Sequence, residues 1–404
     1  MNGLNAPDSW ILEEISNLCK VKGGKRLPKG STFSEHKTDY PYIRVTDMVK
    51  KSVNEETLKY ISQEIFQKIR NYTISSEDAY ITIAGTIGLS GVIPEHLNGT
   101  SLTENAAKLV IKDKSKLDKK YLVYVLDSKF VKGQIDARIG IVGVPKLALF
   151  RIESLKIPIP PLSIQAQIVA ILEKAERLKE KREQANQETN KIIQSVFYEM
   201  FGNIARNDYG WNELTAEEIF DMKLGKMLSA KNYTGKHLKP YLRNINVQWG
   251  SLDLSDIKEM DFDDNEFPRY ELKKDDILVC EGGEVGRTAI YNGEIENCCY
   301  QNALHRLRIK KPIIERQYFV YYMQFAAKYG LILRDTSQVT IAHFTAEKFK
   351  KFKVLLPPIE LQNEFASIVE KVESLKERQR QSTQEINTLF DALLQKAFNG
   401  ELVA

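Results

Sequence analysis

The feature that most constrains the fold is an internal repeat with a fixed offset. The segment Ile157–Lys191 recurs as Val354–Thr388, and "IPIPPLSIQAQIVAILEKAERLKEKREQ" aligns with "VLLPPIELQNEFASIVEKVESLKERQRQ" without a gap. The Pro-Pro pairs at 160–161 and 357–358, with Gln165 and Gln362, fix the offset at 197 residues. Self-similarity of this kind indicates two copies of one structural unit.

The parts that precede the repeated segments are similar at a looser level. "YLVYVL" (Tyr121–Leu126) aligns with "YFVYYM" (Tyr318–Met323) at the same offset, and "PYIR" (Pro41–Arg44) aligns with "PYLR" (Pro240–Arg243) at 199. The chain is therefore a tandem duplication in the order globular part, long helix, globular part, long helix. The helical parts are alike and the globular parts have diverged, as expected where shared mechanics serve separate recognition.

The repeated segments carry a heptad pattern, with apolar residues at intervals of alternately four and three. Charged and amide side chains fill the other positions, as a solvated helix surface requires. Polar residues interrupt the pattern near mid-helix, at Arg182 and Thr189 in the first copy and at Gln379 and Ser382 in the second. The apolar residues that we predict to form the spacer seam are Ile168, Ile171, Ala175, Leu178, Ile192, Phe365, Ile368, Val372, Leu375 and Leu389.

Neither predicted helix can bury its seam alone. Two near-identical seams most simply pack on each other, and an antiparallel pair would bring the central polar positions together, where they could fix register. Two alternatives remain: each helix packs on its own globular part, or the helices pair between chains. The prolines suit the helix starts, and Gly202 and Gly400 stand where C-terminal caps belong.

Strand-like runs outnumber helical ones in both globular parts, and the turns between them are rich in glycine. Within the first part, Asp118–Ile135 is predicted as a helix and Leu149–Pro160 as a strand. We therefore predict an α+β fold in which two mixed α/β domains are joined and spaced by a pair of long antiparallel coiled-coil helices, a pseudo-twofold tandem repeat. The predicted boundaries are 1–157 for the first domain, 158–203 for the central helix, 204–354 for the second domain and 355–404 for the C-terminal helix.

Composition excludes several classes of protein. No stretch approaches 18 consecutive apolar residues, so we expect no membrane span, and the N-terminus lacks a basic-then-apolar signal pattern. The four cysteines show no CxxC spacing, which fits a reducing cytoplasm better than a disulfide framework or a zinc site. The net charge of +4 is compatible with nucleic acid without being evidence for it.

Motifs for catalysis are missing. The sequence has no GxxxxGK[ST] for ATP, and "IAGTIG" and "EGGEVG" are too short for a dinucleotide fingerprint. Asp264, Glu271 and Lys273 offer the residue types of a metal nuclease, but short matches of this kind are common by chance. The five histidines lie far apart with no metal-ligand spacing. These absences favour a protein that reads a ligand over one that catalyses a reaction.

Two basic segments lie at matching positions in the two halves. Residues 20–59 hold ten Lys or Arg against five Asp or Glu, and residues 219–258 hold seven against three. Glycines and small polar residues are interleaved with them. Such loops can approach a phosphate backbone closely, so the matched pair favours a nucleic-acid surface over a merely solvated one.

The duplicated segments resemble the specificity subunit of Type I restriction-modification systems. The resemblance spans essentially the whole chain and is most specific from Pro160-Pro161 through Gln165, from Pro357-Pro358 through Gln362, and at "KAFNGEL" (Lys396–Leu402). One departure is "IQAQ" (Ile164–Gln167), where the usual Glu before Gln is missing.

The resemblance implies a noncatalytic subunit with two target-recognition domains, each reading half of a bipartite site in double-stranded DNA across a gap set by the helical spacer. It further implies two modification (methyltransferase) subunits docked on the spacer, which direct adenine methylation, and restriction subunits that can join them. No cofactor or metal is expected on this chain. S-adenosylmethionine, ATP and magnesium would belong to partner subunits.

Candidate DNA contacts are polar or basic residues on predicted loops and strand ends that recur between halves. Asn can pair bidentately with adenine, and Arg with guanine or phosphate. The candidates in the first half are Lys25, Arg26, Arg44, Thr86, Asn105 and Lys146, and those in the second half are Lys226, Arg243, Glu281, Asn302, His305 and His343.

Two other functions remain open at this stage. The chain could be a tandem scaffold or RNA-binding interaction protein that holds two ligands at a fixed separation. It could also be an enzyme with an unrecognised site, such as a nuclease. Sequence-specific binding to duplex DNA but not RNA would separate the first from the DNA reader, and incubation with DNA and magnesium would reveal the second.

Overall fold

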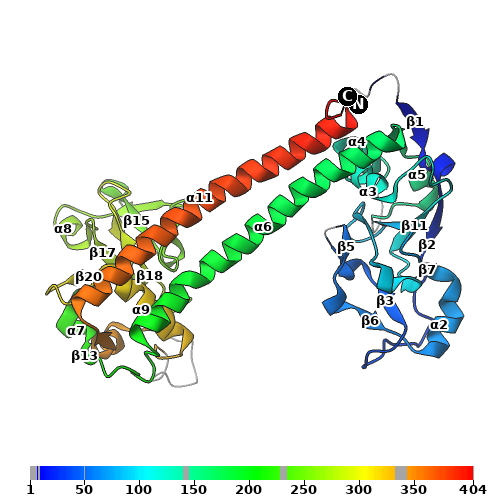
Figure 1. The fold of residues 1–404 in the computed structure, drawn as a ribbon. Coiled ribbons are helices and arrows are strands. Elements are labelled where there is room, and N and C mark those ends of the chain that lie inside the picture. Colours follow the sequence, from blue (N-terminus) through cyan, green and yellow to red (C-terminus); the bar gives the residue numbers. More distant parts are fainter. Residues whose placement is uncertain are drawn as a thin grey trace. The chain divides into compact units, whose positions relative to one another are not determined.

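A computed structural model describes residues 7, 10–49, 51–139, 145–227, 234–332 and 344–403. The chain divides into two compact units, one formed by residues 1–183 with 381–404 and the other by residues 184–380. Each unit therefore contains one globular domain and half of each long helix (Figure 1). The predicted fold class is confirmed: two mixed α/β domains repeat in tandem and share an antiparallel pair of long helices.

The first globular domain is built on two four-stranded sheets, ordered β6-β3-β10-β7 and β2-β11-β8-β9. A two-stranded ribbon of β1 and β12 lies beside the start of the long helix, and β4 and β5 form a short hairpin. The strands are β1 (Ile11–Glu14), β2 (Cys19–Gly23), β3 (Pro41–Ile43), β4 (Met48–Val49), β5 (Ser52–Val53), β6 (Lys59–Tyr60), β7 (Thr73–Ile74), β8 (Ala79–Thr82), β9 (Ser90–Val92), β10 (Thr100–Leu102), β11 (Ala106–Ile111) and β12 (Lys156–Ile159). The helices are α1 (Ile15–Leu18), α2 (Gln63–Ile69), α3 (Lys119–Asp127), α4 (Lys129–Asp136) and α5 (Leu149–Glu153).

The second domain repeats this plan with sheets ordered β14-β20-β17-β18 and β16-β15-β19 and a ribbon of β13 and β21. Its strands are β13 (Asn212–Thr215), β14 (Phe220–Leu224), β15 (Leu238–Leu242), β16 (Lys258–Asp261), β17 (Asp276–Cys280), β18 (Thr288–Tyr291), β19 (Cys299–Tyr300), β20 (Leu304–Ile309) and β21 (Lys353–Leu356). Its helices are α7 (Ala216–Ile219), α8 (Phe267–Tyr270), α9 (Arg316–Lys328) and α10 (Ala346–Lys351).

The long helices are α6 (Leu162–Phe201) and α11 (Ile359–Phe398), drawn in green and in orange to red in Figure 1. We call them the spacer helices. Each has 40 residues, which is about 60 Å at 1.5 Å per residue. The predicted glycine caps are confirmed, because Gly202 and Gly400 both have a φ of +73°, the left-handed conformation that ends a helix.

Two local predictions need correction. Asp118–Ile135 forms two helices, α3 and α4, because the Ser128 hydroxyl caps the second by accepting the N–H of Val131. Leu149–Pro160 is not one strand, because its first part folds as α5 before β12 begins. Leu149 and Ile152, three residues apart, both pack on the core, which is the spacing of a helical turn that the apolar run obscured.

The seam prediction also needs correction. Of the two predicted apolar positions in each heptad, one faces the seam in the structure as predicted. The other seam-facing position lies one residue further along the chain than predicted. The kept positions include the buried or half-buried residues Ile168, Ala175, Phe365 and Val372. The moved position is occupied by the buried residues Leu172, Ile193, Val369 and Phe390 in place of Ile171, Ile192, Ile368 and Leu389. By the same one-residue shift, Lys179 and Lys376 occupy the seam positions that were predicted for Leu178 and Leu375. Leu178 and Leu375 are 46% and 37% exposed.

The domains select this frame. Ile168 and Leu172 belong to one buried cluster with Tyr121 of α3 and with Phe390 and Leu394 of α11. In the second unit, Ile193 and Phe197 of α6 cluster in the same way with α9 and with Phe365 of α11. Each helix therefore packs on its partner helix and on a globular domain at once, so the two packing arrangements that the sequence left as alternatives coexist.

The polar interruption contains a direct contact between the spacer helices. Gln379 Nε2 donates to Thr189 Oγ1 at 2.9 Å, and Thr189 donates in turn to the Ala185 carbonyl at 2.8 Å. Both side chains are buried. A buried polar pair of this kind favours one register over others that would leave its groups unpaired.

Candidate nucleic-acid interface and spacer contacts

The repeated glutamine that follows each Pro-Pro pair joins a domain to its spacer helix. Gln165 is fully buried; its Oε1 accepts the N–H of Asp118 at 2.9 Å and its Nε2 donates to the carbonyls of Lys116 and Pro160 at 2.8 Å each. Asp118 caps α3, so the glutamine fixes the start of that helix against α6.

Gln362 repeats this arrangement in the second unit. It accepts the N–H of Glu315, the cap of α9, at 2.8 Å and donates to the carbonyls of Ile313 and Pro357 at 3.2 and 2.7 Å. The strongest motif of the sequence is thus a structural joint, and the same three hydrogen bonds explain why it recurs in both halves.

We expect Gln165→Ala and Gln362→Ala to destabilise their own units by about 2–4 kcal/mol each, because each leaves one buried carbonyl, one part-buried carbonyl and one part-buried N–H without their partner. Denaturant unfolding of the purified chain measures the loss. Gln167→Ala, at an exposed position of the same turn, is the matched control and should change stability by less than about 0.5 kcal/mol. Equal effects of Gln165→Ala and Gln167→Ala would contradict the role of the joint.

The structure gathers most first-half candidates at one end of the sheet β2-β11-β8-β9. Gly24 N–H donates to the Ala106 carbonyl at 3.0 Å, which sets Lys25 and Arg26 beside the Glu104–Asn105 turn. The Asn105 carbonyl accepts the N–H groups of Ile83 and Ala84.

The same sheet end includes Lys146 and Thr86. Ala84 forms a β-bridge with Lys146, and the hairpin turn after β8 carries Thr86. Lys25, Arg26, Thr86 and Lys146 are exposed, and Asn105 is half-buried. We call these five residues the first sheet-end cluster. Arg26 Nε is held at 2.8 Å from Glu104, and the Lys25 ammonium lies 5.3 Å from the centre of the Tyr72 ring.

Arg44 lies elsewhere and is occupied within the protein. Its guanidinium binds Asp47 at 2.7 and 3.0 Å and the Thr57 carbonyl at 2.7 Å, which closes the turn after β3. Arg243, its repeat counterpart, donates to the carbonyl of Asp256 at 2.7 Å and to its carboxylate at 2.8 Å. Sequence reasoning missed this role, although an acidic or amide residue three positions after each arginine, Asp47 and Asn246, was a signal for a local cap.

The second sheet end has the same backbone plan but different side chains. Asn302 N–H donates to the Lys226 carbonyl at 2.9 Å, and Glu281 N–H donates to the Ala303 carbonyl at 3.0 Å, so Lys226, Glu281 and Asn302 meet. The Lys226 side chain is only 11% exposed and its ammonium lies 2.5 Å from Glu266. Lys226, Glu281 and Asn302 form what we call the second sheet-end cluster.

Of the two candidate histidines, His305 does not join this cluster. His305 is 1% exposed, and its ring nitrogen lies 2.9 Å from the Phe344 carbonyl. Burial lowers the pKa of His305, which keeps the ring neutral, so its place is in the core rather than at the surface. His343 lies outside the described residues.

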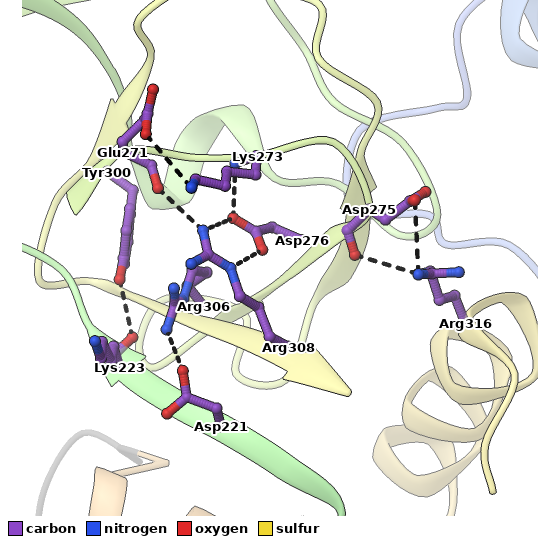
Figure 2. A network of polar contacts seen from close by, with 10 residues as sticks. All are labelled: Asp221, Lys223, Glu271, Lys273, Asp275, Asp276, Tyr300, Arg306, Arg308 and Arg316. Atoms are coloured by element: carbon purple, nitrogen blue, oxygen red, sulfur yellow. Dashed lines mark hydrogen bonds and ion pairs between the residues drawn. The ribbon is translucent and has the colours of Figure 1, made fainter. Parts of the chain in front are cut away.

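An arginine network supports the sheet β14-β20-β17-β18 (Figure 2). Arg308 binds the buried carboxylate of Asp276 at 2.5 and 2.8 Å. Arg306, 1% exposed, binds Asp221 at 2.8 Å across β14 and β20. Both arginines are paired with carboxylates of the adjacent strands β14 and β17, so the basic residues of β20 contribute to the sheet rather than to a free surface.

Glu271 and Lys273, two of the three residues that suggested a metal nuclease, lie beside this network. Lys273 Nζ is 4.0 Å from Glu271, and the Lys273 backbone N–H donates to Asp276 (Figure 2). Within the described ranges, no group of three or more His, Cys, Asp or Glu is placed to hold a metal ion. Over those same ranges, no helix is both long enough and apolar enough to cross a membrane.

The spacer helices of the first unit carry an exposed apolar groove of about 390 Å³. Leu178 and Leu389, which are 46% and 49% exposed, lie in its wall. Its full lining is Ile171, Lys174, Ala175, Arg177, Leu178, Lys181, Leu389 and Leu393. The repeat places Ile192 and Leu375 at the matching positions of the second unit, where both are exposed. We call the lining residues the spacer groove.

Comparison with known proteins identifies the family. The sequence matches the Type I restriction modification DNA specificity domain twice, over residues 7–190 and 209–388. It is 22% identical over 435 residues to the Type I restriction enzyme EcoBI specificity subunit of Escherichia coli, covering 100% of this chain and 89% of that protein. It is 22% identical over 431 residues to the MjaVIII specificity subunit of Methanocaldococcus jannaschii, covering 100% and 95%.

Solved structures show the same fold. A chain from a structure of type I R-M system assembly and conformational transition has a TM-score of 0.68 at 20% identity and covers 98% of this chain and 99% of its own. The crystal structure of the HsdS subunit from Thermoanaerobacter tengcongensis has a TM-score of 0.53 at 20% identity, with 98% of each chain covered. The two matched domains and the shared fold place the chain in one family: it is a DNA specificity subunit of the Type I restriction-modification family.

Proposed function

We propose that each globular domain reads one half of a split site in double-stranded DNA and that the spacer helices set the gap between the halves. The chain itself supplies recognition and no catalysis. The observation that carries the proposal is the repeated sheet end, where loops distant in sequence bring basic and amide side chains together in both units. S-adenosylmethionine, ATP and magnesium would act on partner subunits.

The first sheet-end cluster has the composition of a DNA-reading surface. Lysine and arginine side chains can neutralise phosphates and place the domain, while an amide such as Asn105 can read a base edge. The second cluster is less basic because Lys226 is paired with Glu266. We therefore propose that the first domain supplies more of the electrostatic affinity, and that the second reads its half-site mainly through Asn302 and Glu281.

The spacer groove would receive a modification subunit. Its wall is apolar, and Lys174, Arg177 and Lys181 line it with positive charge, so the complementary partner face is apolar with an acidic border. The matching exposed residues Ile192 and Leu375 in the second unit provide for a second copy of the same partner. Restriction subunits would join through this assembly.

Methylome sequencing tests the proposal directly. A host without adenine methylation of its own would express the modification subunit encoded beside this chain, with and without the chain. A new adenine mark in a split motif that depends on the chain would support the proposal and give the gap length. A soluble complex that leaves no mark on DNA would favour a scaffold or RNA-binding role.

We expect Asn105→Ala to relax base selection in one half-site only. Loss of a bidentate amide contact costs about 1–3 kcal/mol of base discrimination, which is roughly a 5- to 150-fold change at one base pair. Methylation of duplexes carrying every single-base variant of the site measures this loss. Asn302→Ala is the matched variant and should affect the other half-site. Relaxation of both half-sites by either variant would contradict separate readers.

A further inference from the structure

We propose that Lys51 is a positioning residue that seats the first globular domain on the spacer helices, and that the second domain lacks this tie. The inference rests on the proposed function and extends it: Lys51 would hold the first reader at a fixed orientation and so sharpen the choice of gap length.

Lys51 lies between β4 and β5, in the body of the first domain, and its side chain reaches three helices. The ammonium Nζ is 3.0 Å from Asp127 Oδ2 at the end of α3 and 2.8 Å from Glu176 Oε1 on α6. It also lies 5.7 Å from the ring centre of Phe390 on α11 and 5.1 Å from that of Tyr124. One side chain thus connects the β4–β5 hairpin with α3 and both spacer helices, all within the first unit.

The surroundings of Lys51 favour a charged, fixed ammonium. Burial by itself lowers the pKa of Lys51, but the carboxylates of Asp127 and Glu176 outweigh it and leave the pKa raised. Glu176 is oriented by the Tyr124 hydroxyl, which donates to it at 2.5 Å. The ammonium therefore has two anionic acceptors and two aromatic faces that all belong to helices.

The backbone also indicates that Lys51 is selected for its side chain. Its φ is +62°, a left-handed conformation that costs a non-glycine residue energy. The repeat counterpart is Gly250, with a φ of +74°. The turn therefore suits glycine in both units, and the first unit carries lysine against that preference.

In the second unit, the region that corresponds to the surroundings of Lys51 contains no lysine at the matching position, which is Gly250. A hollow of about 380 Å³ opens beside Gly250, lined among others by Tyr321, Gln324 and Glu373, the counterparts of Tyr124, Asp127 and Glu176. Glu373 is instead paired with Lys376 of its own helix at 2.8 Å. The second domain thus has the counterparts of the residues that hold Lys51, but Gly250 has no side chain to place among them.

The experiment compares gap selectivity in complexes of the full chain with its modification subunit. Duplexes would carry both native half-sites at the native gap, one base pair shorter and one base pair longer. Lys51→Met removes the ammonium, while Asp127 keeps Lys132 at 2.5 Å and Glu176 keeps Tyr124. Lys68→Met is the matched control, because Lys68 is exposed and pairs with Glu64 on the surface of α2.

We expect Lys51→Met to raise methylation at the wrong gaps, relative to the native gap, by about fivefold or more, the lower end of typical coupling between sites. Lys51→Arg should restore much of the selectivity, and Lys68→Met should leave it unchanged. A Cβ at Gly250 would have Val320 Cγ1 at 3.9 Å as its nearest heavy atom outside the adjacent residues, and the left-handed backbone there is one that Lys51 adopts in the first unit. Gly250→Lys should therefore sharpen gap selectivity by refilling the hollow.

Two results would overturn the inference. An equal loss of methylation at all three gaps with Lys51→Met would show that Lys51 only stabilises the fold. Unchanged gap selectivity with both Lys51→Met and Gly250→Lys would show that the side chains at positions 51 and 250 do not affect the choice of gap length. These differ from failure of the proposed function itself, in which the wild-type chain would direct methylation to no split site, and the inference would fall with it.

Discussion

A seven-residue insertion in each spacer helix, after Glu183 and after Arg380, is expected to move modification to a new site. The half-sites should stay the same and the gap should lengthen by about three base pairs, since one heptad adds about 10 Å of helix and B-DNA rises about 3.4 Å per base pair. Both insertion points lie where the two compact units divide, so each unit keeps its own packing. Methylome sequencing reads the gap, and methylation at the original gap should fall at least about 100-fold.

Two control insertions test whether the gap depends on paired helices of equal length with an intact heptad pattern. A heptad in one helix only would leave the two seams unequal in length and should prevent a stable chain. Four residues in each helix also lengthen it, but they break the heptad frame and should unwind the pair locally. Altered half-sites at an unchanged gap would show that the helices do not set the spacing.

The positions of the spacer helices could be predicted from the sequence, but the residues of their seam could be predicted only in part. Pro-Pro pairs, glycine caps and the repeat located α6 and α11, because those signals act on the chain locally. These local signals do not determine which of two adjacent apolar residues faces the seam. Ile171-Leu172 and Ile192-Ile193 each offer an apolar residue to either of two frames, one residue apart. The domain core decides between them, and its residues, such as Tyr121, are distant in sequence.

The candidate DNA contacts could likewise be predicted only in part from the sequence. Composition located the basic segments, and backbone hydrogen bonds between strand ends gather Lys25, Asn105 and Lys146 at one place. Sequence could not show which charges are already paired. Lys226 meets Glu266 only because β15, β16 and β19 bring the two together across 40 residues of chain. His305 follows Leu304 into the core because both faces of β20 are covered there.

The exposed apolar residues of the spacer helices follow from the same frame shift. The structure leaves some residues of the predicted seam outside it, and Leu178 and Leu389 among them lie together in the wall of the spacer groove. A grouped apolar surface of this kind is typical of an interaction site. A heptad sequence with apolar residues in two adjacent frames can bury one frame against its partner helix and keep the other for a further protein.

Glutamate at these positions should therefore weaken docking strongly without unfolding the chain. We expect Leu178→Glu with Leu389→Glu to weaken binding of one modification subunit on the order of 100-fold or more, because centrally placed anchors commonly contribute 2 kcal/mol or more each. Ile192→Glu with Leu375→Glu should remove the other copy, and all four changes should remove both. Native mass spectrometry counts the copies. Leu12→Glu is the matched control, since Leu12 is as exposed as Leu389 but lies on β1.

The order of loss separates docking from general damage. If the spacer groove binds the partner, each pair of substitutions should leave one copy bound and leave the melting temperature of the isolated chain nearly unchanged, because the altered side chains already face solvent. If two full copies remain on the fourfold variant, the partner binds another surface. DNA binding by the chain should also persist, since the sheet-end clusters lie on the globular domains and share no residue with the spacer groove.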